Sequence, residues 1–474
     1  MDKTWLKQYP AGVPAEVDVG LYPSLVALID AALGRAKSAR ACHYLGRDYS
    51  YGQVDDLARA FAAYLQSLGL QRGDRVAVMM PNVPQYLVVV PAILRAGYVV
   101  VNVNPLYTAR ELEHQLKDSG AKAIIILENF AAVLQQVAAA VPVRHVVLAS
   151  MGDMLGFVKG MIVNHVVRRV KKLVPAFKLP GAVRFNDAIA KGRGKPYTAA
   201  QVGPDDVAVL QYTGGTTGVA KGATLLHRNL VANLLQAAAW YGPALKRIPE
   251  GEQVTTICAL PLYHIFGFNI NLMLSLHLGG ANILIPNARD IPALVKELKK
   301  HRFHSFPAVN TLYNAVMNHP DAAQVDWSHL CVVASGGMAV QSATARRWFE
   351  LTGCPLLEGY GLSETSPVVC ANPVDITAYT GSIGLPLPNP EVKLIDDAGN
   401  EVPPGVAGEL AVRGPQVMAG YLQRLDETAK VMTADGFMRT GDIGVMDAQG
   451  YTRIIDRKKD MILVSGFNVF PNEL

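Results

Sequence analysis

Short apolar runs alternate with amphipathic stretches along most of this 474-residue chain. Strands are predicted at residues 75–80, 98–103, 123–127, 254–260, 281–285 and 330–334. Helices are predicted at residues 85–96, 110–119 and 291–301. Because a strand that is followed by a helix and another strand forms a β-α-β unit, this order predicts an α/β fold with parallel sheets covered by helices.

The pattern changes after residue 380. Glu391-Val-Lys-Leu-Ile-Asp396 and Gly408-Glu-Leu-Ala-Val-Arg413 alternate polar with apolar residues, and turns rich in Gly and Pro lie between them. This period of two is typical of antiparallel strands that have one face in water. The end of the chain is therefore predicted to form a small antiparallel or barrel-like subdomain. A chain of this length also exceeds one ordinary core, so several subdomains are expected.

Three glycines and three threonines lie together at residues 213–218, and Lys221 follows them. Glycine lets a backbone approach a ligand closely, and successive N–H groups of such a loop can bind an anion. The apolar run 207–210 precedes the loop, which therefore leaves the end of a strand, where open α/β sheets bind ligands. We predict a polyphosphate site formed by Thr213, Gly214, Gly215, Thr216, Thr217, Gly218 and Lys221.

The loop differs from the commoner phosphate-binding pattern. That pattern has Gly directly before its Lys and Ser or Thr directly after it, whereas Ala220 and Gly222 flank Lys221 here. A flexible surface turn is the alternative for these residues. It is disfavoured because turns seldom combine this glycine spacing with so many hydroxyl groups.

A carboxylate lies in the stretch Tyr360-Gly-Leu-Ser-Glu-Thr365. Mg²⁺ binds one or two carboxylates together with phosphate oxygens and waters, so Glu364 is predicted to be a metal ligand. Tyr360 offers an aromatic face for adenine, and Ser363 offers a hydroxyl to phosphate. The alternative is a helix cap formed by Ser363 or Glu364. The family resemblance described below implies a nucleotide, and the residues of this stretch and its surroundings that would bind it are Gly336, Gly337, Glu358, Gly359, Tyr360, Gly361 and Ser363.

Asp442 follows Thr440 and Gly441. Its carboxylate can accept hydrogen bonds from both hydroxyls of a ribose. An aspartate that only stabilises a turn is the alternative.

Five stretches, in this order, resemble the adenylate-forming superfamily of acyl-CoA synthetases, luciferases and peptide-synthetase adenylation domains. They are the loop at 212–223, Leu260-Pro-Leu-Tyr-His-Ile-Phe266, Glu358-Gly-Tyr-Gly-Leu-Ser-Glu-Thr365, Arg439-Thr-Gly-Asp442, and 456–473. The resemblance covers the whole chain. It is greatest to bacterial FadD-type long-chain fatty acyl-CoA synthetases, as at Trp5-Leu-Lys-Gln-Tyr-Pro10 and at residues 101–114.

The resemblance implies a fold with one large N-terminal domain, residues 1–455. This domain would hold two parallel-rich β-α sheets and the barrel-like part at about 380–455. Residues 456–460 would form a hinge, with Lys459 as its pivot, and 461–474 would begin a small C-terminal domain. The rest of that domain, with a lysine that reaches the reaction centre in the family, is expected to be missing from this chain, which would impair it.

The resemblance also implies a reaction in two steps. A fatty carboxylate attacks ATP to give acyl-AMP and diphosphate, and coenzyme A then takes the acyl group, with Mg²⁺ as cofactor. Thr213, Lys221, His264 and Glu364 would be catalytic, and Arg457 would contact ribose or phosphate. The acyl group would contact His264, Phe266, Gly267 and Phe268. Ordinary core packing remains an equal alternative for His264 and the two phenylalanines.

Residues 155–178 form a basic amphipathic segment. They hold six basic residues and no acidic one, and apolar residues recur at three- and four-residue steps. A basic amphipathic helix is typical of segments that bind an anionic membrane surface. A helix packed on the body of the protein, with its basic face in water, is the alternative.

The remaining composition favours a cytoplasmic protein. The cysteines are widely spaced and lack any CxxC pair, so neither disulfides nor a zinc site is expected: Cys42, Cys258, Cys331, Cys354 and Cys370. The N-terminus lacks a signal-peptide core, and the net charge of +5 is spread along the chain, which gives no indication of nucleic acid. A homodimer and a monomer both remain open.

These features predict a long-chain fatty acid–CoA ligase that feeds fatty acid degradation. No acidic residue lies between Leu260 and Asn269, which disfavours amino-acid substrates because their ammonium group requires a carboxylate partner. A medium-chain or aryl-CoA ligase and a fatty acyl-AMP ligase remain as alternatives. So does a non-catalytic protein that binds nucleotide and lipid.

Overall fold

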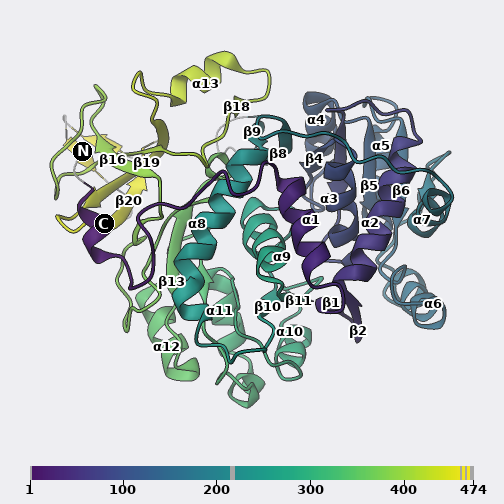
Figure 1. Ribbon diagram of the computed structural model, residues 1–474, viewed down its shortest axis with the longest axis horizontal. Helices are drawn as coiled ribbons and strands as arrows, with labels where there is room; N and C mark the ends of the chain where they lie inside the picture. Colours follow the sequence, from purple (N-terminus) through teal and green to yellow (C-terminus); the bar gives the residue numbers. More distant parts are fainter. Residues whose placement is uncertain (1–2, 214–218, 459–461, 465–466, 470–474) are drawn as a thin grey trace. The chain divides into compact units, whose positions relative to one another are not determined.

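The computed structural model describes residues 3–213, 219–458, 462–464 and 467–469 (Figure 1). The chain divides into two compact units. The first unit comprises residues 22–231 and 253–288, and the second comprises 1–21, 232–252 and 289–474. Among the described residues, no helix has the length and apolar character needed to cross a membrane.

The first unit is built on a large sheet whose strands follow the order β9-β8-β4-β3-β5-β6-β7. Neighbouring strands are parallel, except that β9 runs antiparallel to β8. The central strands β3, β4 and β5 are almost entirely buried. The bounds are β3 Arg75–Met79, β4 Val99–Asn102, β5 Ala123–Leu127, β6 His145–Ala149, β7 Val183–Arg184, β8 Val207–Thr213 and β9 Lys221–Leu226.

Helices connect these strands, as the alternating sequence pattern predicts. They are α1 Leu25–Arg35, α2 Tyr51–Gln66, α3 Pro84–Arg95, α4 Ala109–Ser119, α5 Ala131–Val137, α6 Phe157–His165 and α7 Phe185–Arg193. Helix α3 is buried along its whole length, which explains its nearly continuous apolar sequence. Helix α4 begins after Thr108, whose side chain accepts a hydrogen bond from the amide of Glu111 in a capping box.

A second sheet of the first unit has the order β10-β11-β1-β2. Strands β10, β11 and β1 are parallel, and β2 is antiparallel to β1. Between β10 and β11 the chain forms a π-helical segment at Gly267–Met273, followed by α9 Leu274–Leu278. The strand bounds are β1 Arg40–Tyr44, β2 Arg47–Ser50, β10 Thr255–Cys258 and β11 Ala281–Leu284.

The second unit holds two four-stranded sheets, ordered β12-β13-β14-β15 and β16-β17-β19-β20. The first is formed by β12 Ala334–Ser335, β13 Leu357–Gly361, β14 Val368–Ala371 and β15 Leu385–Pro386. The second is antiparallel and is formed by β16 Glu391–Ile395, β17 Gly408–Arg413, β19 Met438–Met446 and β20 Thr452–Arg457. Its other elements include α10 Ile291–Leu298, α11 Asn310–Met317, α12 Ser342–Thr352, β18 Gly420–Tyr421 and α13 Leu425–Val431.

Two elements span or follow these units. Helix α8, His227–Leu245, begins in the first unit and continues in the second. A short antiparallel pair, β21 Ile462–Val464 and β22 Phe467–Val469, comes after β20 in the chain.

The predicted α/β fold with several sheets is confirmed, and the alternating segment after residue 380 is antiparallel. The strand predicted at 330–334 is largely wrong. Only Ala334–Ser335 forms a strand there, and Val332 makes an isolated bridge with Ser305. An apolar run of this length is buried whether or not its backbone joins a ladder, so hydrophobicity alone does not fix it as a strand.

Candidate active site

The predicted phosphate loop connects two antiparallel strands of the first unit. Thr213 ends β8 and Lys221 begins β9, and the two residues are paired in register. Both flanks of the loop are therefore fixed by the sheet. Five members of the predicted phosphate site lie outside the described residues: Gly214, Gly215, Thr216, Thr217 and Gly218.

Helix α4 braces this hairpin through polar contacts. The hydroxyl of Tyr212 donates to Oδ2 of Asp118 across 2.7 Å, and His114 Nε2 lies 2.9 Å from the carbonyl oxygen of Ala220. Gly222 lies directly beneath the Tyr212 ring, where a Cβ would come within 3.1 Å of the ring carbons. A side chain at Gly222 would therefore require the Tyr212 ring to shift by a few tenths of an ångström.

Buried amide side chains hold the motif at 260–266 in the first unit. Asn82 donates to the carbonyl oxygens of Cys258 and Leu260 at 2.8 and 2.9 Å, and its Oδ1 accepts from the amide of Leu262 at 2.9 Å. Gln211 of β8 donates to the carbonyl oxygen of Tyr263 at 3.2 Å. A buried amide with all its groups paired fixes its surroundings, so the backbone leading to His264 has a defined path.

His264 and the phenylalanines that follow it differ in burial. Phe268 is fully buried, Phe266 is half-buried, and the His264 side chain is exposed. The amide of Phe266 donates to Nδ1 of His264 across 3.3 Å. The dense protein around this histidine still desolvates the ring and lowers its pKa, which favours the neutral imidazole. Core packing therefore describes Phe268 but not His264.

In the second unit, Glu358 lies on β13 with its carboxylate buried. Its Oε1 accepts a hydrogen bond from the amide of Val340 at 3.0 Å. Burial raises the pKa of this carboxyl group to about 7, although the hydrogen bond from Val340 opposes the rise. Gly337 follows the neighbouring strand β12 and has a φ of +80°, a conformation that favours glycine.

Glu364 lies in a short 3₁₀ helix, Ser363–Thr365, and its side chain is 8 % exposed. Oε1 of Glu364 accepts a hydrogen bond from the hydroxyl of Tyr421 across 2.7 Å. The cap of this helix comes from Thr365, whose hydroxyl accepts from the amide of Leu362 at 3.0 Å. Thr365 thus takes the capping role that was the alternative for Ser363 and Glu364.

Asp442 lies on β19 and contacts two of the other predicted site residues. Its Oδ2 accepts a hydrogen bond from the Tyr360 hydroxyl at 2.5 Å, and its Oδ1 lies 3.5 Å from Nε of Arg457. Arg457 is the partner of Asp442 in the β19–β20 register. Tyr360, Asp442 and Arg457 are therefore one cluster, although 97 residues separate the first from the last.

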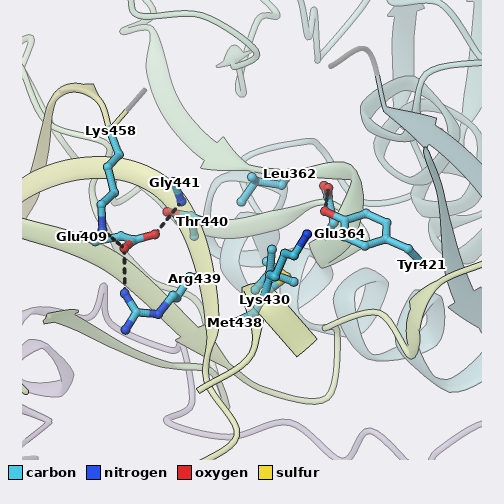
Figure 2. Close-up of a pocket in the computed structure, with 11 residues that line it drawn as sticks. Leu362, Glu364, Glu409, Tyr421, Lys430, Met438, Arg439, Thr440, Gly441 and Lys458 are labelled. Carbon is cyan, nitrogen blue, oxygen red and sulfur yellow. Dashed lines mark hydrogen bonds and ion pairs between the residues drawn. The ribbon is translucent and has the colours of Figure 1, made fainter. Parts of the chain in front are cut away.

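A cavity of about 390 Å³, drawn in Figure 2, is lined by residues that include Gly441 and Lys458, the sequence neighbours of Asp442 and Arg457. Its lining includes Leu362, Tyr421, Thr440 and Gly441. The charged residues of the lining are Glu364, Glu409, Lys430, Arg439 and Lys458.

Figure 2 shows Glu409 between Lys458 and Arg439 on one side of the cavity, and Glu364 with Tyr421 on the other. Oε2 of Glu409 lies 3.0 Å from Arg439 and 3.1 Å from Lys458, and its Oε1 accepts from the amide of Gly441 at 3.2 Å. The two cations neutralise the Glu409 carboxylate. Glu364, in contrast, contacts a neutral hydroxyl.

The donor set of Glu364 fits a hard divalent cation. A carboxylate at a cavity wall, held through one oxygen by a phenol, resembles the ligands that Mg²⁺ takes in proteins together with phosphate oxygens and waters. Glu409 fits less well, because Arg439 and Lys458 already contact its Oε2 and the amide of Gly441 donates to its Oε1. This side of the cavity therefore offers one carboxylate that carries no ion pair with Arg439 or Lys458.

Sequence reasoning missed Tyr421 and Glu409. Neither lies in a motif with recognisable spacing, and Tyr421 is 57 residues from its partner Glu364. Lys459, the predicted hinge residue, lies outside the described residues.

Comparisons with known proteins confirm the family that the motifs resemble. The family model described as AMP-binding enzyme matches residues 29–422. A long-chain-fatty-acid–CoA ligase of Escherichia coli O6:H1 is 54 % identical over 100 % of this chain and 84 % of its own length. A ligase with the same description from Bacillus subtilis is 36 % identical over 100 % of this chain and 83 % of its own length.

Solved structures of CoA ligases have a similar fold. The anthranilate CoA ligase AuaEII in complex with anthranoyl-AMP has a TM-score of 0.82 at 25 % identity, covering 96 % of this chain and 83 % of that one. A long-chain-fatty-acid-CoA ligase from Archaeoglobus fulgidus has a TM-score of 0.77 at 25 % identity, covering 95 % and 87 %.

Proposed function

Because the chain belongs to the family of AMP-binding enzymes, we propose that it is a long-chain fatty acid–CoA ligase, with fatty acid degradation as the use of its product. The observation that carries this proposal is the identity of 54 % along the whole chain to a ligase of that description. The reaction consumes ATP, a fatty acid and coenzyme A, and it yields acyl-CoA, AMP and diphosphate through acyl-AMP.

Neither step requires a nucleophile from the protein, because the fatty carboxylate and the thiol of coenzyme A are the attacking groups. The protein has to hold the reacting groups in line, neutralise the charge that develops and exclude water. Lys221 and the backbone of the phosphate loop would bind the phosphates in the first unit. A bound Mg²⁺ would supply further charge neutralisation, with Glu364 as its protein ligand.

The nucleoside would be held by the second unit. Tyr360 would stack on adenine, Asp442 would accept hydrogen bonds from the ribose hydroxyls, and Arg457 would contact ribose or phosphate. The contacts between Tyr360, Asp442 and Arg457 support this assignment, because they orient the Asp442 carboxylate before the ligand arrives. His264 would lie where acyl group and adenylate meet. The imidazole of His264 is exposed, and its lowered pKa favours the neutral form. A neutral ring can contact the fatty acid without forming an ion pair with its carboxylate.

The remaining roles follow the family pattern. Phe266 would line the acyl site, and Lys459 would act as the hinge residue. We also propose that the protein is cytoplasmic and contacts the membrane through residues 155–178.

Release of AMP tests the proposed function directly. The protein should release AMP from ATP when palmitate and coenzyme A are both present, and far less when either is omitted. Release with palmitate alone would indicate a fatty acyl-AMP ligase. A higher kcat/KM for decanoate or benzoate than for palmitate would indicate a medium-chain or aryl-CoA ligase. Nucleotide binding without AMP release under every condition would indicate a non-catalytic protein.

A further inference from the structure

Helix α6 is attached to the first unit by its polar and glycine face. A Cβ on Gly160 would lie 2.4 Å from the carbonyl oxygen of Gly152, so the backbones touch at this point. Oδ1 of Asn164 accepts a hydrogen bond from the amide of Gly152 at 2.8 Å. One turn further, Arg168 forms two contacts of 2.9 Å with the buried Glu128. Gly160 and Asn164 lie four apart on α6, so they share one face of this helix, and Arg168 belongs to the π-helical segment Val166–Val170 that follows it.

The large apolar side chains of α6 point the other way, into solvent. Phe157 is 85 % exposed, Val158 64 %, Met161 57 % and Ile162 55 %. A helix on the surface of a soluble protein normally buries its apolar face and exposes its polar one. Helix α6 reverses this arrangement, and contiguous exposed apolar residues of this kind mark a surface that binds another partner. In Figure 1, α6 projects at the edge of the first unit, away from the strands of the large sheet.

Basic residues follow this apolar face along the chain. Arg169, Lys171, Lys172 and Lys178 are exposed, and residues 155–178 contain no acidic residue. No ion pair is found for these four cations among the described residues. Arg168 differs, because its guanidinium is committed to Glu128. A partner that fits this surface therefore has negative charges next to an apolar region.

We propose that α6 docks the protein on a bilayer that contains anionic phospholipid, with Phe157, Val158, Met161 and Ile162 among the acyl chains and the four cations at the headgroups. A phospholipid surface presents both chemistries, whereas an acidic protein surface lacks the apolar phase. The purpose of this membrane contact rests on the ligase function proposed above. A fatty acid and its CoA ester are amphiphiles that partition into bilayers, so a docked enzyme would meet its substrate there.

Vesicle flotation tests the docking surface. The protein should float with vesicles of phosphatidylcholine and phosphatidylglycerol, and binding should weaken as salt screens the headgroup contacts. The double variant Phe157→Asp/Met161→Asp should bind at least tenfold more weakly. Leu106→Asp is the matched control, because Leu106 is 59 % exposed elsewhere in the same unit, and this variant should bind as the parent does. Equal binding by the double variant and the parent would overturn the proposal.

Quenching of tryptophan fluorescence tests whether α6 inserts into the bilayer. The variant Phe157→Trp should be quenched by vesicles that contain brominated lipid, and Leu106→Trp should not. If the parent protein does not bind vesicles but sediments as a dimer that Phe157→Asp/Met161→Asp dissociates, the face is an interface between two copies and the proposal is wrong.

The docking test is independent of the ligase assignment. AMP release with albumin-delivered palmitate should be the same for the double variant and the parent. Absence of AMP release from both, together with normal flotation, would overturn the proposed function and leave the docking surface intact.

Discussion

The hydroxyl of Tyr421 donates a hydrogen bond to Oε1 of Glu364 across 2.7 Å, and both residues line the same cavity. Burial raises the pKa of this phenol, and the nearby Glu364 carboxylate raises it further, so Tyr421 stays protonated and remains a donor at neutral pH. A fixed donor on one oxygen sets the orientation of the carboxylate. Because the hydrogen bond to Oε1 holds the whole carboxylate, it also fixes the direction of Oε2, the oxygen that would bind the metal.

Removing the Tyr421 hydroxyl should weaken the metal site without abolishing it. We expect Tyr421→Phe to raise the Mg²⁺ concentration needed for half-maximal acyl-AMP formation by about 10- to 100-fold, the usual effect of losing a residue that orients a ligand. Hydroxamate trapping of acyl-AMP across a Mg²⁺ titration measures this. Tyr451→Phe is the control, because Tyr451 lies outside the cavity lining. A lower rate with an unchanged Mg²⁺ dependence would assign Tyr421 a different role.

Glu364 itself should matter far more. Glu364→Gln keeps the shape of the side chain but removes its charge, and we expect acyl-AMP formation to fall by several orders of magnitude, because metal-ion stabilisation supplies several kcal/mol in such reactions. Glu350→Gln removes a charge from the exposed face of α12 and should leave the rate unchanged. If Glu364→Gln keeps its rate within tenfold of the parent while circular dichroism shows a folded protein, Glu364 is not the metal ligand.

Glu358 should make stability depend on pH. Burial raises its pKa from 4.5 to about 7 in the folded protein. Between these two values the unfolded chain has lost the proton while the folded one keeps it. The folded state therefore binds more protons, and its stability falls as pH rises from 4.5 through 7.

The variant Glu358→Gln isolates this effect, because glutamine does not titrate. The gain in stability of the variant over the parent should grow by about 3 kcal/mol between pH 4.5 and pH 8, at 1.36 kcal/mol for each pKa unit. Thermal melts of both proteins across this range measure the difference. Asp153, whose pKa burial raises to about 6, acts equally on both proteins and cancels. A difference independent of pH would show that Glu358 is ionised in the folded protein.

Much of the fold could be predicted because the strands are short, continuous apolar runs. β3 and β5 were predicted almost to the residue, since strands buried on both faces carry few polar residues. The strand at 330–334 was predicted too long for the same reason, because a buried apolar run need not join a ladder. The motifs pointed to Asp442 as a site residue together with its partners Tyr360 and Arg457, and to Glu364 without its partner Tyr421.

Partners were missed where the contact depends on tertiary structure. Tyr421 and Glu409 reach the cavity only because β17, β18 and the helix at Ser363–Thr365 come together in the second unit. The basic segment at 155–178 shows the same limit. Its composition indicated a helix, but the sequence could not tell which face is attached. That face depends on a backbone contact between Gly152 and Gly160 and on the pair of Arg168 with Glu128, which is 40 residues away.

The hydrogen bond from Tyr360 to Asp442 gives the last prediction. A hydrogen bond to a charged group contributes about 1.5–3 kcal/mol, and its loss would leave the Asp442 carboxylate with Arg457 as its charged neighbour. Tyr360→Phe keeps an aromatic face for adenine but no longer orients Asp442. We expect the dissociation constant for ATP, measured by calorimetry, to rise at least tenfold. The 2′,3′-dideoxy analogue lacks the ribose hydroxyls that Asp442 would bind, so its affinity should hardly change. An equal loss for both nucleotides would show that Tyr360 acts on adenine alone and that Asp442 does not read the ribose.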